Sequence, residues 1–190
     1  MNELIKKHIL EHSAVLDSIE HLDESIIRVA NLLISCLEKG GTIFWCGNGG
    51  SASDSQHLAG ELVGRFVGNR KPLKSISLLT GGAEGSCISN DFGYDQIFSR
   101  QIEALGSKGD VLVGITTSGN SKNVLNAFEA AKNKGVTTIG LLGKGGGLAK
   151  DLVDETITIL SNSTARVQEM HILIGHMLCD LIEEGLNLKR

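Results

Sequence analysis

Five short apolar runs alternate with helix-like stretches between residues 42 and 184, and this alternation constrains the fold more than any other feature. The runs cover residues 42–46, 75–79, 111–115, 137–142 and 155–160. Strands that alternate with helices build βαβ units, in which the strands are parallel and the crossovers are right-handed. The sequence therefore predicts an α/β fold with a five-stranded parallel sheet between helices.

The two ends of the chain are predicted to be helical. Residues 3–39 contain two helices, and the glycine pair Gly40-Gly41 ends the second. Apolar residues recur along these helices at Leu4, Ile5, Ile9, Leu16 and Ile19, and then at Ile26, Ala30, Leu33, Ile34 and Leu37. Residues 164–184 form a last long helix. We expect one domain over residues 1–190, whose helices in 1–40 pack on the domain or on a partner subunit.

The composition excludes several classes of protein. The formal net charge is -4 and only 4% of residues are aromatic, so a general nucleic-acid binder is unsuited to this chain. No apolar run reaches the roughly 18 residues that span a bilayer. The N-terminus lacks the apolar segment of a signal peptide. The four cysteines contain no C-x-x-C pair, so we expect buried or semi-buried thiols in a reducing cytoplasm rather than disulfides or a cysteine-ligated zinc: Cys36, Cys46, Cys87 and Cys179.

A glycine-rich turn follows the first predicted strand. It reads Gly47-Asn48-Gly49-Gly50-Ser51-Ala52 and leads into a helix, whose free N–H groups favour an anion. The string fits a dinucleotide pattern, but that motif needs an acidic residue where the second strand ends, and Glu84 comes too late. The simpler alternative is that Ser51 only caps the helix, in a capping box with Asp54.

A second turn, after the third strand, carries hydroxyl side chains. Thr116, Ser118 and Ser121 surround Gly119-Asn120. One such turn is weak evidence, because serine and asparagine are ordinary turn and cap residues. Ligands of parallel sheets bind beyond the carboxyl ends of the strands. Two polar turns there favour a phosphate on a sugar over a magnesium-bound triphosphate.

Four further residues could together bind a metal ion or transfer a proton. His57 and Glu61 are four apart and so share one helix face. Gln168 and His176 are eight apart, roughly 80° around a helix. Together they could hold a divalent metal, most plausibly zinc. The alternatives are a solvated H-x-x-x-E face and an ordinary interior role for His171 or His176. Asn90-Asp91 could meet sugar hydroxyls or make a turn.

In combination these motifs resemble the bacterial phosphoheptose isomerases of the sugar-isomerase (SIS) fold. The resemblance covers nearly the whole chain and rests on the strings Cys46-Gly-Asn-Gly-Gly-Ser51, His57-x-x-x-Glu61-Leu-x-Gly-Arg65-Phe66, Asn90-Asp-Phe-Gly-Tyr94, Phe98-Ser-Arg100, Gly109-Asp-Val-Leu112, Thr116-Thr-Ser-Gly-Asn-Ser121 and Gln168-Glu-x-His171 with His176. It implies a three-layer, flavodoxin-like sheet with an N-terminal helical extension. It also implies a cytoplasmic homotetramer with active sites between subunits.

The resemblance further implies the conversion of D-sedoheptulose 7-phosphate to D-glycero-D-manno-heptose 7-phosphate, the first step toward the nucleotide-activated heptose of lipopolysaccharide core or other surface glycans. One zinc ion per subunit would be held by His57, Glu61, Gln168 and His176. Substrate-binding roles would fall to Asn48, Gly49, Gly50, Ser51, Glu61, Asn90, Asp91, Thr116, Thr117, Ser118, Ser121 and Gln168.

Isomerisation between an aldose and a ketose moves a proton between C1 and C2 through an enediol. We assign Glu61 as the base and His176 as the acid on the opposite side of the sugar. A metal would help at the enediolate oxygens, but Glu61 cannot be a firm ligand and a free base at once.

Two other functions remain open at this point. A protein of the same fold assists the bacterial replication initiator without known chemistry, but such proteins lack the acid at Glu61 and the histidine at His176. Other SIS proteins act on hexose phosphates. The Asn90–Tyr94 string argues against a hexose-phosphate function for this chain, but more weakly than Glu61 and His176 argue against the adaptor.

Overall fold

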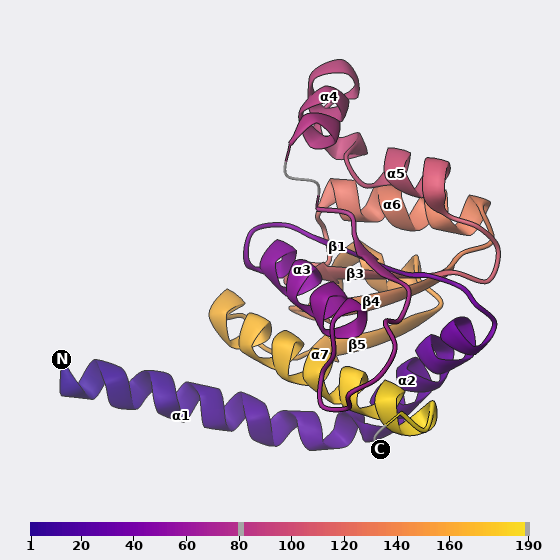
Figure 1. Ribbon diagram of the computed structural model, residues 1–190. Helices are drawn as coiled ribbons and strands as arrows, with labels where there is room; N and C mark the ends of the chain where they lie inside the picture. Colours follow the sequence, from indigo (N-terminus) through magenta and orange to yellow (C-terminus); the bar gives the residue numbers. More distant parts are fainter. Residues whose placement is uncertain (80–81, 189–190) are drawn as a thin grey trace.

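The structure, a computed structural model that describes residues 1–79 and 82–188, has three layers with a sheet in the middle (Figure 1). All strands are parallel, in the order β2-β1-β3-β4-β5. They are β1 (Ile43–Gly47), β2 (Ser75–Ser77), β3 (Val111–Thr116), β4 (Thr137–Gly143) and β5 (Glu155–Ile159). The predicted fold class and all five strands are confirmed, with bounds shifted by one or two residues.

Both faces of the sheet are covered, which explains why the strands are apolar throughout rather than alternating. Every residue of β1 and β3 is buried. On one face lie α2 (Asp23–Glu38), α3 (Gly50–Val63) and α7 (Thr164–Gly185), and on the other α5 (Ser99–Leu105) and α6 (Lys122–Asn133) (Figure 1). Neighbouring side chains of β1 point to opposite faces of the sheet. Trp45 packs in the core beneath α2, α3 and α7, and Phe44 packs in the core beneath α5 and α6.

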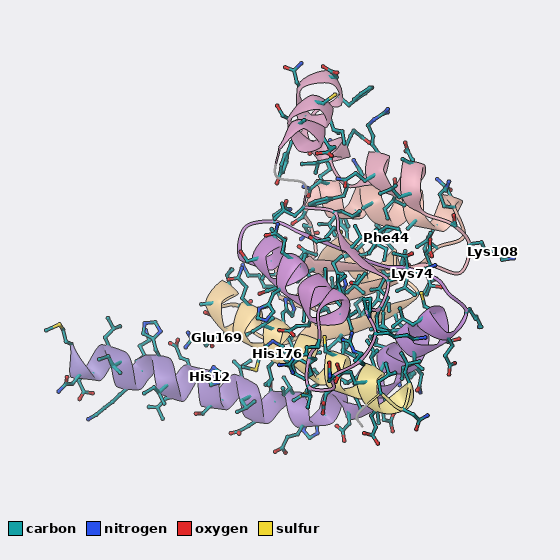
Figure 2. The ribbon with its side chains drawn as sticks, viewed as in Figure 1. His12, Phe44, Lys74, Lys108, Glu169 and His176 are labelled. Carbon is teal, nitrogen blue, oxygen red and sulfur yellow. The ribbon has the colours of Figure 1, made fainter. Side chains whose placement is uncertain are left out.

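The first helix extends from the body as an arm (Figure 1). α1 (Asn2–Ser18) buries no residue and is joined to α2 by the 3₁₀ turn η1 (Ile19–Leu22). Two hydrogen bonds hold the arm against α7. His12 Nδ1 donates to Glu169 Oε2 at 2.7 Å (Figure 2), and Arg166 donates to the carbonyl of His8 at 2.6 Å. The predicted N-terminal helices are confirmed.

The segment between β2 and β3 differs from the sequence-based prediction, which placed no helix there. It contains α4 (Ala83–Phe92), η2 (Tyr94–Gln96) and α5. A short 3₁₀ turn, η3 (Gly147–Asp151), also follows β4. α4 buries only Gly85, so it has no apolar stripe that could reveal it. Asn90 and Asp91 lie in its last turn, so the alternative of a simple turn is wrong for them.

Two further expectations can be compared with the structure. Cys36, Cys46 and Cys179 are buried as expected, but Cys87 is exposed on α4, so the expectation of burial is wrong for that thiol. Among the described residues, no helix combines the length and the apolar character that crossing a bilayer requires.

Candidate active site

The two polar turns meet at the point where the strand order reverses. β1 and β3 are neighbours, while the chain continues from β1 to β2 on one side and from β3 to β4 on the other. The turns after β1 and β3 therefore leave the same edge of the sheet side by side. Asn48 in the first turn and Asn123 in the first turn of α6 exchange hydrogen bonds of 2.9 Å.

The first turn needs its glycines for space and for backbone conformation. Gly49 has a φ of +58°. A Cβ atom on Gly50 would lie 2.5 Å from Nε2 of Gln168, so the amide of Gln168 packs directly on this turn. The capping-box alternative is wrong, because the N-cap of α3 is Gly49 without a side-chain cap, and Ser51 is buried inside the helix.

The second turn gathers three hydroxyl groups. The Thr116 hydroxyl lies 3.0 Å from that of Ser121 and 3.3 Å from that of Ser118. Ser121 is the N-cap residue of α6, so the first N–H groups of that helix open beside the hydroxyls. Hydroxyls together with free N–H groups can hold a phosphate group without metal or lysine.

A third glycine-rich segment, which the sequence reasoning did not use, supports the second turn from behind. Leu148 N donates to Asn120 Oδ1 at 3.0 Å, and Ala149 N donates to the carbonyl of Gly119 at 2.9 Å. A Cβ on Gly119 would collide with the carbonyl of Gly146. In the sequence, the run Gly145-Gly146-Gly147 was the signal that could have revealed this segment. In the structure all three residues have positive φ.

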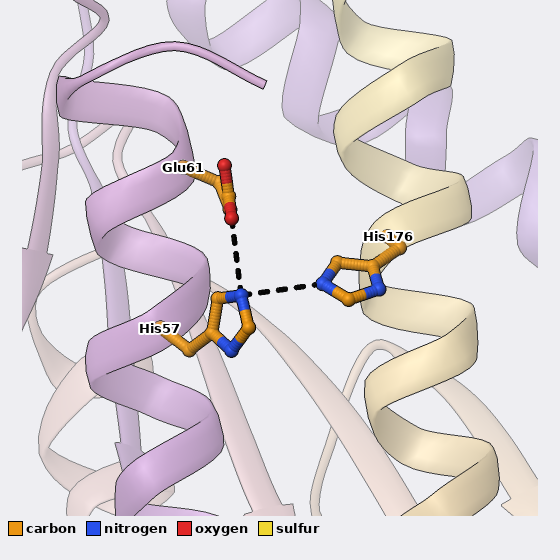
Figure 3. Close-up of side chains that lie close together, drawn as sticks. All are labelled: His57, Glu61 and His176. Atoms are coloured by element: carbon orange, nitrogen blue, oxygen red, sulfur yellow. Dashed lines mark hydrogen bonds and ion pairs between the residues drawn. The ribbon is translucent and has the colours of Figure 1, made fainter. Parts of the chain in front are cut away.

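His57, Glu61 and His176 form one cluster between α3 and α7 (Figure 3). Nε2 of His57 lies 3.0 Å from Oε1 of Glu61 and 3.3 Å from Nε2 of His176. The three ligand atoms lie within 4.8 Å of one another. Figure 3 also shows the second oxygen of Glu61 directed away from the two imidazoles.

A buried ion pair fixes the chain that leaves α3. The carboxylate of Glu183 accepts hydrogen bonds from the N–H groups of Phe66, Val67 and Gly68 and from Arg70 Nε, at 2.7–3.1 Å. Arg70 also donates to the carbonyl of Glu61 at 2.9 Å. This arrangement stacks the Phe66 ring on His176, with ring centroids 5.5 Å apart. Sequence reasoning did not identify Arg70 or Glu183; a carboxylate beside the apolar stripe of the last helix was the available signal.

Three of the ionisable groups with shifted pKa values lie on the two helices that carry the cluster: Glu183 and His171 on α7, and Asp54 on α3. Burial alone would raise the pKa of Glu183, but hydrogen bonds from Gly68, Phe66, Val67 and Arg70 outweigh it and lower the pKa. Burial lowers the pKa of His171 to about 4, so this imidazole is neutral and its Nε2–H donates to the carbonyl of Leu142. His171 is thus the interior histidine, whereas His176 is only partly buried.

The third group is Asp54, one helical turn before His57. Burial raises its pKa, and the nearby charge of His57 offsets part of that effect. Its Oδ2 is buried and has no hydrogen-bond partner among the described residues.

The expected site residues fall into three places. The first place is the pair of turns, with Asn48, Gly49, Gly50, Ser51, Thr116, Thr117, Ser118 and Ser121, and with Gln168 against Gly50. The second is the cluster of His57, Glu61 and His176. The third is α4, which stands apart from the sheet edge (Figure 1) and where Asn90 Nδ2 donates to Asp91 Oδ1 at 2.7 Å. Among the described residues, no hydrogen bond joins Gln168 to the cluster.

The comparisons with known proteins first identify the class of protein to which this chain belongs. The sequence profile of the SIS domain matches residues 8–143, which is most of the chain. The fold, the switch-point turns and this match define an SIS-domain protein.

Closer relatives give the particular protein. The chain is 50% identical to a phosphoheptose isomerase of Campylobacter jejuni, over 97% of this chain and 100% of that protein, and 53% identical to one of Helicobacter pylori, over 95% and 94%. The solved phosphoheptose isomerase of Neisseria gonorrhoeae superposes with a TM-score of 0.92 at 40% identity, covering 96% of this chain and 98% of that one. This chain belongs to the phosphoheptose isomerases, which are aldose-ketose isomerases.

Proposed function

We propose that the chain converts D-sedoheptulose 7-phosphate to D-glycero-D-manno-heptose 7-phosphate, the first step toward a nucleotide-activated heptose for lipopolysaccharide core or other surface glycans. The observation that carries the proposal is the presence of two features in one chain. One is the hydroxyl-lined second turn, called the phosphate turn below, with Thr116, Ser118 and Ser121, and the other is the cluster of His57, Glu61 and His176. The test is a turnover assay of the purified protein with D-sedoheptulose 7-phosphate. Capture of a replication initiator without any turnover would support the adaptor function instead.

The chemistry of the cluster fits a zinc ion. With Glu61 ionised, one proton on Nε2 of His57 can satisfy either the carboxylate or the second imidazole, but not both contacts. A cation among the three atoms satisfies all of them. Tetrahedral zinc with ligands at about 2.0–2.1 Å requires ligand atoms about 3.3–3.4 Å apart, and the two imidazole nitrogens are 3.3 Å apart. Asp54 would orient His57, because it lies close enough for their charges to interact and its buried Oδ2 has no hydrogen-bond partner among the described residues.

The zinc proposal predicts stoichiometric metal binding. Wild-type protein should bind one Zn²⁺ per chain, and His57→Ala should weaken that binding by at least about 100-fold, because it removes the central ligand of three. Isothermal titration with Zn²⁺ measures this directly. His21→Ala, on η1, is the matched control and should bind as the wild type does. Equal affinity in the wild type and His57→Ala would contradict the assignment.

Glu61 and His176 can serve neighbouring atoms of the substrate. The ligand atoms of Glu61 and His176 lie within 4.8 Å of each other, whereas two groups on opposite sides of one sugar atom, each at hydrogen-bond distance, stand about 5–6 Å apart. We therefore place both on the same side, with Glu61 at the C1 proton and His176 at the C2 oxygen. Bound zinc would supply electrostatic stabilisation of the developing enediolate.

The proton inventory follows from that placement. The outer oxygen of Glu61, the one directed away from the imidazoles, takes a proton from C1. The Nδ1–H of His176, whose Nε2 would hold the metal, gives a proton to the C2 carbonyl oxygen, which leaves an enediol. Glu61 then returns its proton to C2, and the O1 hydroxyl proton passes to Nδ1 of His176, which gives the aldehyde at C1 and restores both groups. The inner oxygen of Glu61 stays with His57, so the two carboxylate oxygens can divide ligand and base roles.

The length of α3 supports active sites formed between subunits. Glu61 follows Gly50 by eleven residues in this helix, roughly 16 Å at about 1.5 Å per residue. An extended seven-carbon sugar phosphate spans about 10 Å at about 1.5 Å per bond. A sugar held at the phosphate turn therefore does not reach Glu61 of the same chain. Four apolar side chains in the first half of α1 are also more than half exposed, as an arm that packs on other subunits requires: Leu4, Ile5, Ile9 and Leu10.

Complementation between inactive variants tests this interfacial homotetramer. One parent is Glu61→Gln, and the other is Thr116→Val combined with Ser121→Ala, which removes two phosphate-turn hydroxyls. If the turn and the cluster of one site come from different chains, co-refolded mixtures contain intact sites and should recover up to about a quarter of wild-type activity. If each site lies within one chain, the mixture stays as inactive as its parents, and the interfacial proposal fails.

A further inference from the structure

The side-chain amide of Asn48 is held in one orientation by two residues that were not among the expected site residues. Its Nδ2 donates to Oδ1 of Asn123 at 2.9 Å, and its Oδ1 accepts from Nδ2 of Asn123 at 2.9 Å. The hydroxyl of Tyr94 donates to the same Oδ1 at 2.8 Å. Asn48 thus contacts both the helix behind the phosphate turn and the segment that follows α4.

These three bonds leave Asn48 with a defined remaining capacity. An amide oxygen has two lone pairs, and here Asn123 and Tyr94 occupy both. The amide nitrogen has two hydrogens, and Asn123 takes one. Among the described residues the second N–H has no partner, and Asn48 itself is only partly buried. Asn48 is therefore prepared to donate one hydrogen bond and cannot accept any.

The two holding residues are themselves fixed from behind. Asn123 is buried in the first turn of α6. The backbone around Tyr94 is tied to the same helix, because Asn126 Nδ2 donates to the carbonyl of Asp95 at 2.9 Å and Lys122 pairs with the Asp95 carboxylate at 2.8 Å. Tyr94 follows Gly93, whose φ of +88° lets the chain turn sharply out of α4.

We propose that Tyr94 and Asn123 are positioning residues that lock the Asn48 amide so that it presents a single N–H donor to an acceptor oxygen of the sugar phosphate. Because Asn123 lies two residues after the N-cap Ser121, the lock also keeps the first turn in register with the hydroxyls of the second. It further explains why the segment carrying Tyr94 returns to the sheet edge after the exposed α4. This inference rests on the proposed binding of the substrate at these turns.

A double-mutant cycle on kcat/KM separates positioning through Asn48 from a general structural role. In the wild-type background, Tyr94→Phe removes one hydrogen bond and should lower kcat/KM about 3- to 10-fold, as expected for one lost neutral hydrogen bond. In the Asn48→Ala background the same change should have no further effect, because the amide that it orients is gone. The unfolding temperature of each variant should stay close to that of its parent.

Glu129→Gln is the matched control. It removes an exposed carboxylate of α6, the helix that carries Asn123, and leaves the contacts among Tyr94, Asn48 and Asn123 in place, so kcat/KM should remain near the wild-type value. The inference is overturned if Tyr94→Phe has no effect in the wild-type background, or if its effect is equally large with Asn48→Ala. If the wild type itself does not turn over D-sedoheptulose 7-phosphate, the proposed function fails first, which is a different result.

Discussion

Glu61→Gln is expected to lower kcat for the isomerisation of D-sedoheptulose 7-phosphate by about 10²–10⁴-fold, the typical contribution of general acid–base catalysis, because Glu61 is the proposed base. An amide keeps the size of the side chain and one oxygen, but it cannot take a proton from carbon at neutral pH. The backbone at this position is held independently, by Arg70 on the carbonyl of Glu61. Steady-state kinetics and an unfolding curve on the same preparation measure the effect.

The control is Glu129→Gln, an exposed carboxylate on α6, which should leave kcat unchanged. Binding of inorganic phosphate should be the same in Glu61→Gln and in the wild type, because the phosphate turn is a separate part of the structure. Bound metal is measured in parallel, so that loss of the ion is distinguished from loss of the base. Normal turnover by Glu61→Gln would remove Glu61 from the chemistry.

Glu183→Gln is expected to reduce the free energy of unfolding by about 3–5 kcal/mol at pH 7. Removing one charge of a buried ion pair leaves the other uncompensated, and Arg70 and Glu183 are both fully buried side chains. Urea denaturation of the two proteins measures the difference. Glu129→Gln is again the control, with no expected change.

The same pair predicts a pH dependence with a definite sign. The pKa of Glu183 in the folded protein is lowered from its ordinary value of 4.5, so its stabilising contribution is present above that value and is lost as pH falls through the folded pKa. The difference between the wild type and Glu183→Gln should therefore shrink below about pH 4.5. Equal stability of the two proteins at pH 7 would contradict the structural role of this pair.

The sheet could be predicted from the sequence because each strand is a continuous apolar run between turn residues. β1 and β3, buried on both faces, have the simplest pattern, and the helices on either side have apolar stripes. The region between β2 and β3 could not be predicted in the same way. α4 buries only Gly85, so no periodic pattern marks it, and its position depends on contacts such as the one between Tyr94 and Asn48.

The site was predictable where spacing along one helix determines proximity, and less so where distant segments meet. The i, i+4 pair of His57 and Glu61 is confirmed at 3.0 Å. The approach of His176 to the same nitrogen depends on how α3 and α7 pack together on the sheet, which local spacing does not define. The buried pair of Arg70 and Glu183 joins residues 113 positions apart, and the sequence contains no pattern that would pair them.

A crystal structure of Glu61→Gln with D-sedoheptulose 7-phosphate tests the central claim most directly, because the trapped substrate reveals both of its ends. The expected result is a phosphate group within hydrogen-bond distance of the Thr116 and Ser121 hydroxyls of one subunit. The C1–C2 end of the same sugar should lie at residue 61 and His176 of another subunit. A sugar bound elsewhere, or one whose C1–C2 end touches neither position in any subunit, would contradict the account.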